Sequence, residues 1–264
     1  MRDTEREVVA LHRMTTRPLN RPLPQYSTLT IRESSARSMY RGATLSLRNN
    51  SIKRVQLGVQ YTVAQAYSDD DNERSATGFT YDNPANFKPE YGYANLDIRN
   101  NFTSYAVARM PWGVILSGNF SASSGQPIDP IAGSDLNGDG STSDRGYQAV
   151  GVPFQRNSFR NRGWKTVNLR VLKDFRLSEK YRLQLSAEMF NLFNWENVII
   201  GSAATNANTI YGAGINADGS VAAPRSDANG PTFMRLKLPS GLYDSNNGQV
   251  GLPFHSQFGV RFFF

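Results

Sequence analysis

Oxygen-bearing side chains between residues 135 and 146 have the spacing of a calcium-binding loop. The spacing is set by Asp135, Asn137, Asp139 and Gly140. Alternate carboxylate and amide oxygens can wrap one hard cation, and a glycine allows the sharp turn that follows. The usual glutamate at position twelve is replaced by Gly146, so Asp144 is the candidate late ligand. A polar loop rich in turn-forming residues is the competing interpretation, and the sequence leaves both open.

Other catalytic or binding chemistry has little support in the chain. The two histidines, His12 and His255, lie at opposite ends, and there is no cysteine. Metal clusters, thiol nucleophiles and histidine-based triads are therefore not expected. The 29 lysines and arginines give a net charge of +7 but are scattered, which is not the footprint of a nucleic-acid-binding protein. We predict that the chain is not an enzyme, binds no nucleic acid and has no cofactor apart from the candidate calcium ion.

Seven segments alternate apolar and polar residues with a period of two, which is the pattern of a β-strand with one apolar face. They lie at residues 43–47, 55–63, 96–108, 112–122, 167–175, 181–189 and 258–264, and a weaker eighth strand is predicted at 25–32. No run approaches the roughly 18 apolar residues of a transmembrane helix. Several segments are about as long as the roughly 9 to 11 residues with which a tilted strand crosses a bilayer.

The connections between these segments alternate in length. Short turns near residues 49–51, 111 and 178–180 alternate with long connections at 67–95, 125–163 and 194–255. Outer-membrane barrels have short periplasmic turns and long extracellular loops. The predicted fold is therefore all-β: part of an antiparallel up-and-down transmembrane β-barrel with seven or eight strands, over 24–264, after an irregular segment at 1–23. A soluble β-sandwich that acts as a surface or adhesion module for carbohydrate or protein is the main alternative.

Charged residues on the polar face are expected to line the lumen of the barrel. They are Arg99, Arg170, Asp174, Arg182, Glu188 and Arg261. In a complete transporter such side chains could hold a plug through charge-assisted hydrogen bonds. A solvated lumen wall is the other interpretation.

The chain ends on an aromatic strand. Phe258, Val260, Phe262 and Phe264 share one face and alternate with polar residues or glycine. An edge strand with one apolar face can pair with the open edge of another sheet. We therefore predict that these four residues form a signal for the barrel-assembly machinery, in addition to facing lipid.

Several stretches, taken together, resemble one family of membrane proteins. They are "ESSARSMYRGATLSL" from Glu33, "SSGQPI" before Asp129, "DLNGDGSTSDRG" from Asp135, Arg156 to Arg160 with Gly163-Trp164, "VNLRVLKDFRLSEKYRLQLSAEMFNLFN" from Val167, and the closing strand. The order and content of these stretches are similar to those in the C-terminal barrel portion of TonB-dependent outer-membrane transporters, in particular the Oar-like group. The resemblance covers roughly residues 20 to 264.

The resemblance implies a function and a location. It implies uptake of a scarce ligand (an iron chelate, a carbohydrate or a peptide) across the outer membrane of a Gram-negative cell. The chain contains no plug, no TonB-contact segment and no leader, so we expect it to be the C-terminal third of a transporter and not competent for transport alone. Its expected partners are outer-membrane lipid, the barrel-assembly machinery, and the N-terminal strands and plug of the parent, with TonB acting only through the plug. A small self-contained outer-membrane channel is a further alternative.

Overall fold

The computed structural model describes residues 35–70, 81, 86–136, 144–199 and 251–264, together with the strand backbone at 8–12, 29–33, 226–227, 230–231 and 249–250. The described chain consists of β-strands and loops, with short 3₁₀ turns at η2 (Lys88–Glu90) and η3 (Pro111–Gly113). No helix in these residues is long and apolar enough to cross a membrane. The predicted all-β class is confirmed.

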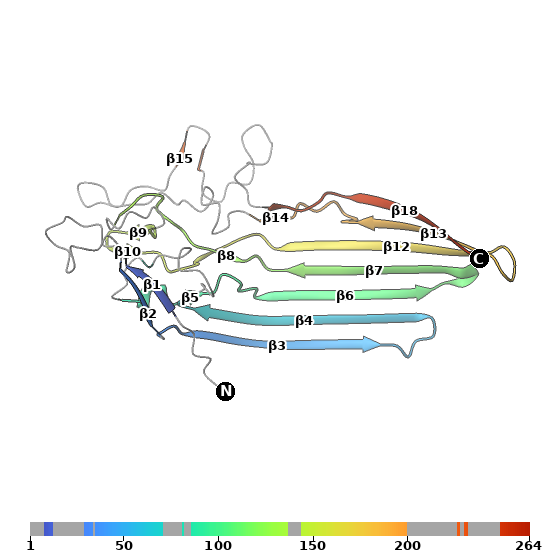
Figure 1. Ribbon diagram of the computed structural model, residues 1–264, viewed down its shortest axis with the longest axis horizontal. Coiled ribbons are helices and arrows are strands. Elements are labelled where there is room, and N and C mark those ends of the chain that lie inside the picture. Colours follow the sequence, from blue (N-terminus) through green and yellow to red (C-terminus); the bar gives the residue numbers. More distant parts are fainter. Residues whose placement is uncertain are drawn as a thin grey trace.

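One large antiparallel sheet dominates the molecule (Figure 1). Its long strands are β3 (Ser38–Asn49), β4 (Val55–Ser68), β6 (Asn100–Arg109), β7 (Val114–Ser123), β12 (Trp164–Arg176), β13 (Arg182–Phe190) and β18 (His255–Phe263). Their spatial order, β18-β13-β12-β7-β6-β4-β3, repeats their order along the chain. The predicted up-and-down topology is therefore confirmed, with strands of 9 to 14 residues.

The connections divide between the two ends of the sheet, as predicted. Short turns join β3 to β4, β6 to β7 and β12 to β13 at the end where the chain terminates, and the three long connections lie at the opposite end (Figure 1). We call these the turn end and the loop end.

Several two-stranded sheets lie outside the path of the long strands. They pair β1 (Val8–His12) with β2 (Leu29–Glu33), β8 (Pro127–Ile128) with β11 (Phe159–Arg160), β9 (Tyr147–Ala149) with β10 (Val152–Pro153), β14 (Val198–Ile199) with β17 (Gln249–Val250), and β15 (Ser226–Asp227) with β16 (Gly230–Pro231). The eighth strand of the large sheet is β5 (Gly92–Tyr93), which pairs with the end of β4.

The weaker strand expected at 25–32 is thus placed differently. Its end corresponds to β2, which pairs with β1 and not with β3. Because β1 lies inside the segment 1–23, part of that segment is a strand. The division of the chain at residue 23 remains a prediction.

The register places the predicted apolar set on one face of the sheet. Directly paired residues project their side chains to the same side. Across one half the pairs run Leu45–Tyr61–Phe102–Ala122, and across the other they run Leu116–Val171–Ala187–Phe258. A slip of one residue would move a strand's apolar side chains to the other face. The alternation in the sequence and the pairing therefore agree across seven strands.

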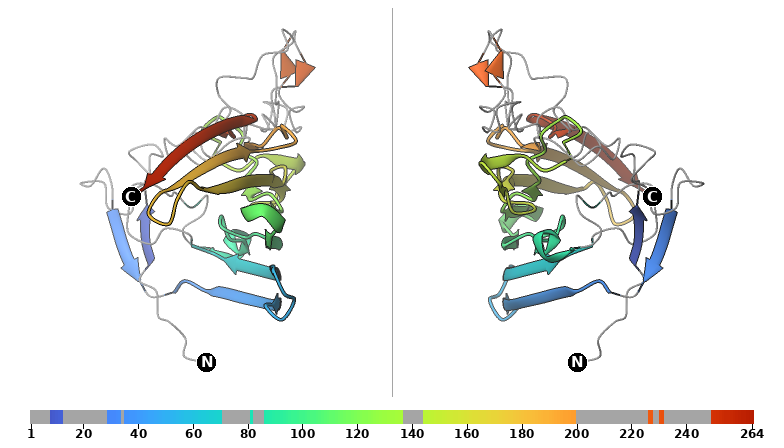
Figure 2. Two further views of the ribbon diagram at one scale, coloured as in Figure 1. Left: turned by 90° about the vertical axis from the view of Figure 1, so that its right-hand side faces the viewer. Right: turned by 90° about the vertical axis from the view of Figure 1, so that its left-hand side faces the viewer.

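No second layer among the described residues covers the apolar face, and Trp195 contacts it only at the loop end, at Phe120. Leu45, Phe258 and Val260 are 74%, 78% and 74% exposed. Sheets in soluble proteins bury one face against a second layer, whereas here the described long strands form one curved layer with β3 and β18 at its two margins (Figure 2). The soluble-sandwich alternative gains no support. An apolar surface of this extent needs an apolar solvent or partner.

Two strands begin later than the alternation predicted. Leu96 and Ile98 precede β6, and Trp112 lies in η3, where its φ of 59° is left-handed. The chain turns before β6 because the Asp97 N–H donates to the Ala94 carbonyl at 2.9 Å. The Asp97 carboxylate is bound by the Ala66 N–H and by Arg160. Apolar residues happen to occupy alternate positions in these turns, so the sequence pattern extended beyond the strands themselves.

Candidate functional site at the base of the long loops

The loop end of the sheet is held together by a buried polar cluster that we call the loop-base network. It comprises Glu90, Asp97, Asp129, Arg145, Arg156, Asn157 and Arg160. These residues come from the connections after β4 and after β7, so the network joins two separate long loops.

Arg145 and Glu90 form the most deeply buried ion pair of the network. The Arg145 Nη2 atom lies 2.7 Å from Glu90 Oε2, and the side chains are 4% and 2% exposed. Arg145 Nε lies 3.5 Å from Asp129 Oδ1, which also accepts a hydrogen bond from the Asn157 N–H. Charges this far from water persist only when paired and hydrogen-bonded.

Arg160 and Asp97 form a second ion pair beside the first strands. The Arg160 guanidinium contacts the Asp97 carboxylate and also donates to the Gly125 carbonyl at 3.2 Å. Asp97 Oδ1 accepts the Ala66 N–H at 2.6 Å, which fixes the end of β4. One carboxylate therefore links a strand end to a distant loop.

Arg156 and Asn157 bond mainly to backbone carbonyls. Arg156 donates to the Ser68 carbonyl at 3.1 Å, and Asn157 donates to the Tyr93 carbonyl at 2.6 Å. Asn157 has a φ of 56°, a left-handed conformation that asparagine tolerates better than most residues. Both side chains therefore bind the backbone at the ends of β4 and β5.

Gly125 allows two of these segments to approach each other closely. A Cβ built at Gly125 would lie 1.9 Å from the Asn161 carbonyl oxygen. The approach brings β8 into register with β11, where Phe159 pairs with Ile128 and Arg160 with Pro127. Only glycine fits beside a backbone at this distance.

Asparagines tie the later strands together at the same end. Asn197 exchanges hydrogen bonds with the backbone of Lys165 at 2.8 and 2.9 Å, as another strand would. Asn191 donates to the carbonyls of Trp195 and Leu252, and Asn194 accepts the Phe254 N–H. These contacts set where β18 begins.

Tyr81 and Asp69 add an outer layer to the cluster. Tyr81 is buried against Ala36 and Phe87. Burial raises the pKa of the Tyr81 phenol, and the nearby carboxylates of Asp70 and Asp69 raise it further. The phenol is therefore neutral at physiological pH and acts as an apolar, hydrogen-bonding side chain.

The predicted lumen charges lie mostly on the polar face of the sheet. Arg170 and Glu188 are cross-strand partners on β12 and β13 with a 2.9 Å ion pair. Asp174 accepts a hydrogen bond from Gln184 at 2.9 Å. The Arg182 guanidinium lies 4.2 Å from the centre of the Phe263 ring, and Arg261 is exposed on β18.

Arg99 differs from the other five, since it precedes β6 and its guanidinium lies 4.6 Å from the centre of the Tyr93 ring. This places it at the loop base and not along the strands. The contact of these six charges with a plug remains a prediction.

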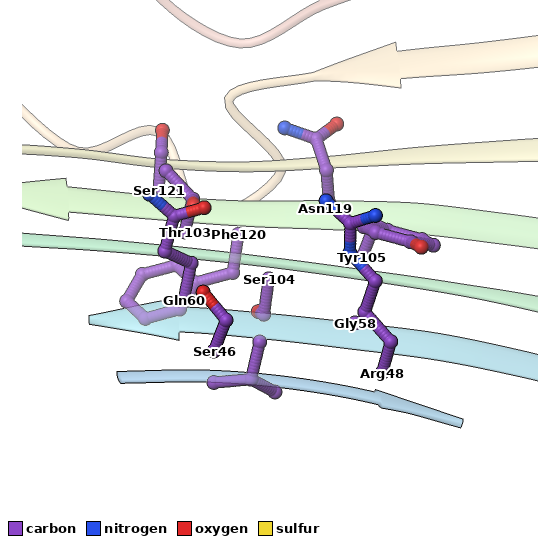
Figure 3. A pocket seen from close by; sticks show the side chains of 11 residues that line it. Ser46, Arg48, Gly58, Gln60, Thr103, Ser104, Tyr105, Asn119, Phe120 and Ser121 are labelled. Atoms are coloured by element: carbon purple, nitrogen blue, oxygen red, sulfur yellow. The ribbon is translucent and has the colours of Figure 1, made fainter. Parts of the chain in front are cut away.

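A hollow of about 250 Å³ lies against β3, β4, β6 and β7 (Figure 3). Its lining includes Ser46, Arg48, Gln60, Thr103, Asn119 and Ser121. Tyr105 lies over Gly58, where a built Cβ would come within 2.4 Å of the ring. Its lining also includes Val59, Tyr105 and Phe120, so the hollow is a depression in the wall with both polar and apolar surface.

The loop-base network contains residues from two of the stretches that carried the sequence resemblance, and its Arg160 donates to the Gly125 carbonyl of a third. The wall beneath it has one apolar and one polar face. A family model described as "Outer membrane beta barrel domain" matches residues 8–155 and 153–225. The chain belongs to this outer-membrane β-barrel family. The comparison with curated proteins and the comparison with solved structures each gave no match.

Membership of this family assigns the barrel domain to the outer membrane and gives direction to its two ends. The turn end is periplasmic and the loop end is extracellular in outer-membrane barrels. The loop-base network is therefore an extracellular structure of the barrel domain, and the exposed apolar face is its lipid-facing surface.

The last strand of the barrel domain and the residue that follows it carry the four residues that were predicted to form an assembly signal. On β18, Phe258, Val260 and Phe262 share the lipid-facing side, and Phe264 follows at 88% exposure. Tyr181 stacks on Phe262 with ring centres 5.8 Å apart. Recognition by the assembly machinery stays a prediction.

The candidate calcium loop is described only at its two ends. Asp135 is exposed, whereas Asp144 is buried and its carboxylate accepts the Leu136 N–H. Asn137 and Asp139 lie outside the described residues. Within the described part of the chain no group of three His, Cys, Asp or Glu side chains is placed to hold a metal ion. The calcium site remains a prediction.

None of the seven residues of the loop-base network was among the predicted site residues. The ion pairs Arg145–Glu90 and Arg160–Asp97 join residues that are 55 and 63 positions apart. The periodicity of a single strand contains no information about such distant contacts. The usable signal was the cluster of arginines and asparagine in Arg156 to Arg160 and the glycine of "SSGQPI", both within stretches already identified by resemblance.

Proposed function

We propose that this barrel domain is part of the wall of a TonB-dependent outer-membrane transporter of the Oar-like group, which takes up a scarce ligand such as an iron chelate, a carbohydrate or a peptide. The observation that carries the proposal is the position of the resembling stretches. Those around Arg145, Arg156 to Arg160 and Gly125 meet in the loop-base network, where they hold the extracellular loops.

The physical argument concerns what an uptake site needs. Ligand contacts on loops require a rigid base. Buried ion pairs add little net stability compared with apolar packing, but removing one partner is costly, so they hold a particular geometry. A network that joins two long loops to the ends of β4 and β5 is suited to presenting those loops in one arrangement.

Uptake by the native cell tests the proposal directly. A strain without the gene is compared with its parent for accumulation of labelled iron chelates, oligosaccharides and peptides, with and without a protonophore. We expect the deletion to abolish uptake of one ligand class and the protonophore to abolish it in the parent, because TonB draws on the proton gradient of the inner membrane. Uptake that survives the protonophore would instead indicate a passive channel.

A further inference from the structure

The polar side of the wall is divided into a charged part and an uncharged part. Charged side chains gather at the turn end and on β12, β13 and β18, where Arg170 pairs with Glu188. The part formed by β3, β4, β6, β7 and the start of β12 carries mainly hydroxyl and amide side chains. Strand pairing arranges it in three rows, which are Thr44–Thr62–Asn101–Ser123–Trp164, Ser46–Gln60–Thr103–Ser121–Thr166 and Arg48–Gly58–Tyr105–Asn119–Asn168. We call these rows the hydroxyl–amide surface.

The hydroxyl–amide surface offers hydrogen bonds but little charge. Arg48 on β3 is the only charged residue of its three rows, and none of the rows contains an aspartate or a glutamate. Each hydroxyl can donate and accept hydrogen bonds, and the amides of Gln60 and Asn119 each carry donors and an acceptor. The surface can therefore bind groups that both donate and accept, but it can compensate very little ligand charge.

Cross-strand contacts hold part of this surface in place. The Ser121 and Thr166 hydroxyl oxygens are 2.8 Å apart, which is a hydrogen bond. Asn168 Nδ2 donates to Asn119 Oδ1 at 3.4 Å and so orients the Asn119 amide. Side chains that are already oriented lose less conformational entropy when a ligand binds them.

Two tyrosines lie against the same side of the wall, each over a glycine. A Cβ built at Gly58 would come within 2.4 Å of Tyr105 Cε1, and one built at Gly42 would come within 2.9 Å of Tyr40 Oη. Tyr105 and Tyr40 are nevertheless 45% and 63% exposed, so each ring has one face on the wall and the other open. Tyr105 borders the hollow formed with β3, β4 and β7 (Figure 3). The negative face of an aromatic ring attracts groups with a positive edge, so an open ring face can stack on the C–H groups of a ligand.

We infer that the hydroxyl–amide surface, together with Tyr105 and Tyr40, binds a neutral oligosaccharide inside the barrel. The inference rests on the proposed function and names the ligand class of the transporter. A sugar ring carries hydroxyl groups around its rim, which both donate and accept hydrogen bonds. Its two faces carry C–H groups, which suit the open tyrosine rings. A neutral sugar brings no charge that the surface would have to compensate.

The other two ligand classes fit this surface less well. A charged iron chelate or a charged peptide would lose water here and find no counter-charge beyond Arg48, and an unpaired charge is costly to remove from water. An extended peptide also binds best along the edge of a sheet, where it adds a strand. The hydroxyl–amide surface is the face of a sheet whose strands already pair with each other.

Binding by the protein purified from native outer membranes in detergent tests the inference. The probes are an array of neutral and acidic glycans, a set of ferric siderophores and a peptide library, and we expect binding of neutral glycans only. The affinity for the best-bound glycan is then measured by calorimetry. Tyr105→Ala and Asn119→Leu should each weaken it roughly three- to tenfold. Tyr105→Phe keeps the ring and should retain binding, whereas Gly58→Ala displaces the ring and should resemble Tyr105→Ala.

The control is Tyr61→Leu, a change on the lipid-facing side of β4, which should leave glycan affinity unchanged. Outer-membrane level and protease resistance identify any variant that fails to fold, and the array result itself needs no variant. Binding of no neutral glycan, or unchanged affinity in folded Tyr105→Ala and Asn119→Leu, would overturn the inference.

Uptake by the native cell separates this inference from the proposed function. Protonophore-sensitive uptake of an iron chelate or a peptide, and of no glycan, would overturn the inference and support the transporter. Glycan uptake that depends on Tyr105 and survives the protonophore would support the inference and contradict the transporter.

Discussion

The buried ion pair of Arg145 and Glu90 makes a quantitative prediction about single residues. Arg145→Met leaves the Glu90 carboxylate, 2% exposed, without its cation. Removing one partner of a buried pair costs about 3–5 kcal/mol of unfolding free energy. The free energy of unfolding is measured by urea titration in detergent micelles, and unfolding is monitored as the loss of protease resistance of the long loops.

Two further variants make this prediction specific. The double variant Glu90→Gln with Arg145→Met removes the uncompensated charge and should recover part of the loss. Arg170→Met breaks an ion pair in which the arginine side chain is 47% exposed, so it should cost no more than about 1 kcal/mol. Equal effects of the buried and exposed changes would contradict the assignment of Arg145 to a desolvated site.

Gly125→Ala tests the close approach of β8 to β11. The added methyl group would lie 1.9 Å from the Asn161 carbonyl oxygen, and neither backbone can move without breaking its pairing. We expect a loss of about 1–3 kcal/mol, as for overpacking elsewhere, with increased cleavage of the loop that contains β9 and β10. Ser134→Ala, at an exposed position of the same connection, should leave unfolding and cleavage unchanged.

The residue scale is also where sequence reasoning was weakest. Asp97 falls within the segment 96–108 that was predicted as a strand, but it precedes β6, its side chain is 1% exposed, and its carboxylate binds the Ala66 N–H and the Arg160 guanidinium. Such contacts depend on where separate loops meet, and loop paths are not encoded in local periodicity. An aspartate such as Asp97 is expected to accept hydrogen bonds, but its residue type does not indicate which groups will donate them.

At the level of elements, the strands were predictable because lipid and water impose a strict alternation. A strand with one face in hydrocarbon tolerates few polar residues there, so the pattern persists over the whole span. Strand ends were less predictable, since Trp112 and Leu96 continued the pattern into turns. The short strands β8 to β11 follow from loop contacts and had no signal of their own.

The last strand gives a prediction at this level. Deletion of Phe264, which directly follows β18, removes the last member of the row Phe258, Val260, Phe262 and Phe264, while the β13–β18 register ends at Phe263 and is kept. If the row is read during assembly, surface levels of the protein should fall several-fold, as measured by surface labelling of intact cells. Phe254→Ala, an exposed phenylalanine before β18, is the control, and unchanged surface levels after the deletion would refute the recognition role.

At the scale of the whole molecule, the barrel wall buries two kinds of surface in two different ways. Apolar surface on the lipid side is buried by the membrane and not by a second protein layer, and charge at the loop end is buried by other loops. The wall thus has a lipid-facing side, a lumen-facing side and, at its extracellular end, the loop-base network. Each face can be tested without disturbing the others.

Adjacent residues on one strand should differ completely in water accessibility. Leu183→Cys and Leu57→Cys lie on the lipid-facing side, whereas Gln184→Cys and Gln56→Cys, each at the adjacent position and at nearly equal depth, lie on the polar side. A membrane-impermeant maleimide applied to opened outer-membrane vesicles should label only the polar-side cysteines, because hydrocarbon excludes the reagent and suppresses thiolate formation. After unfolding in urea, the maleimide should label all four cysteine variants equally. Labelling of the Leu183 and Leu57 positions before unfolding would show that water reaches the apolar face, and that would contradict a membrane wall in this register.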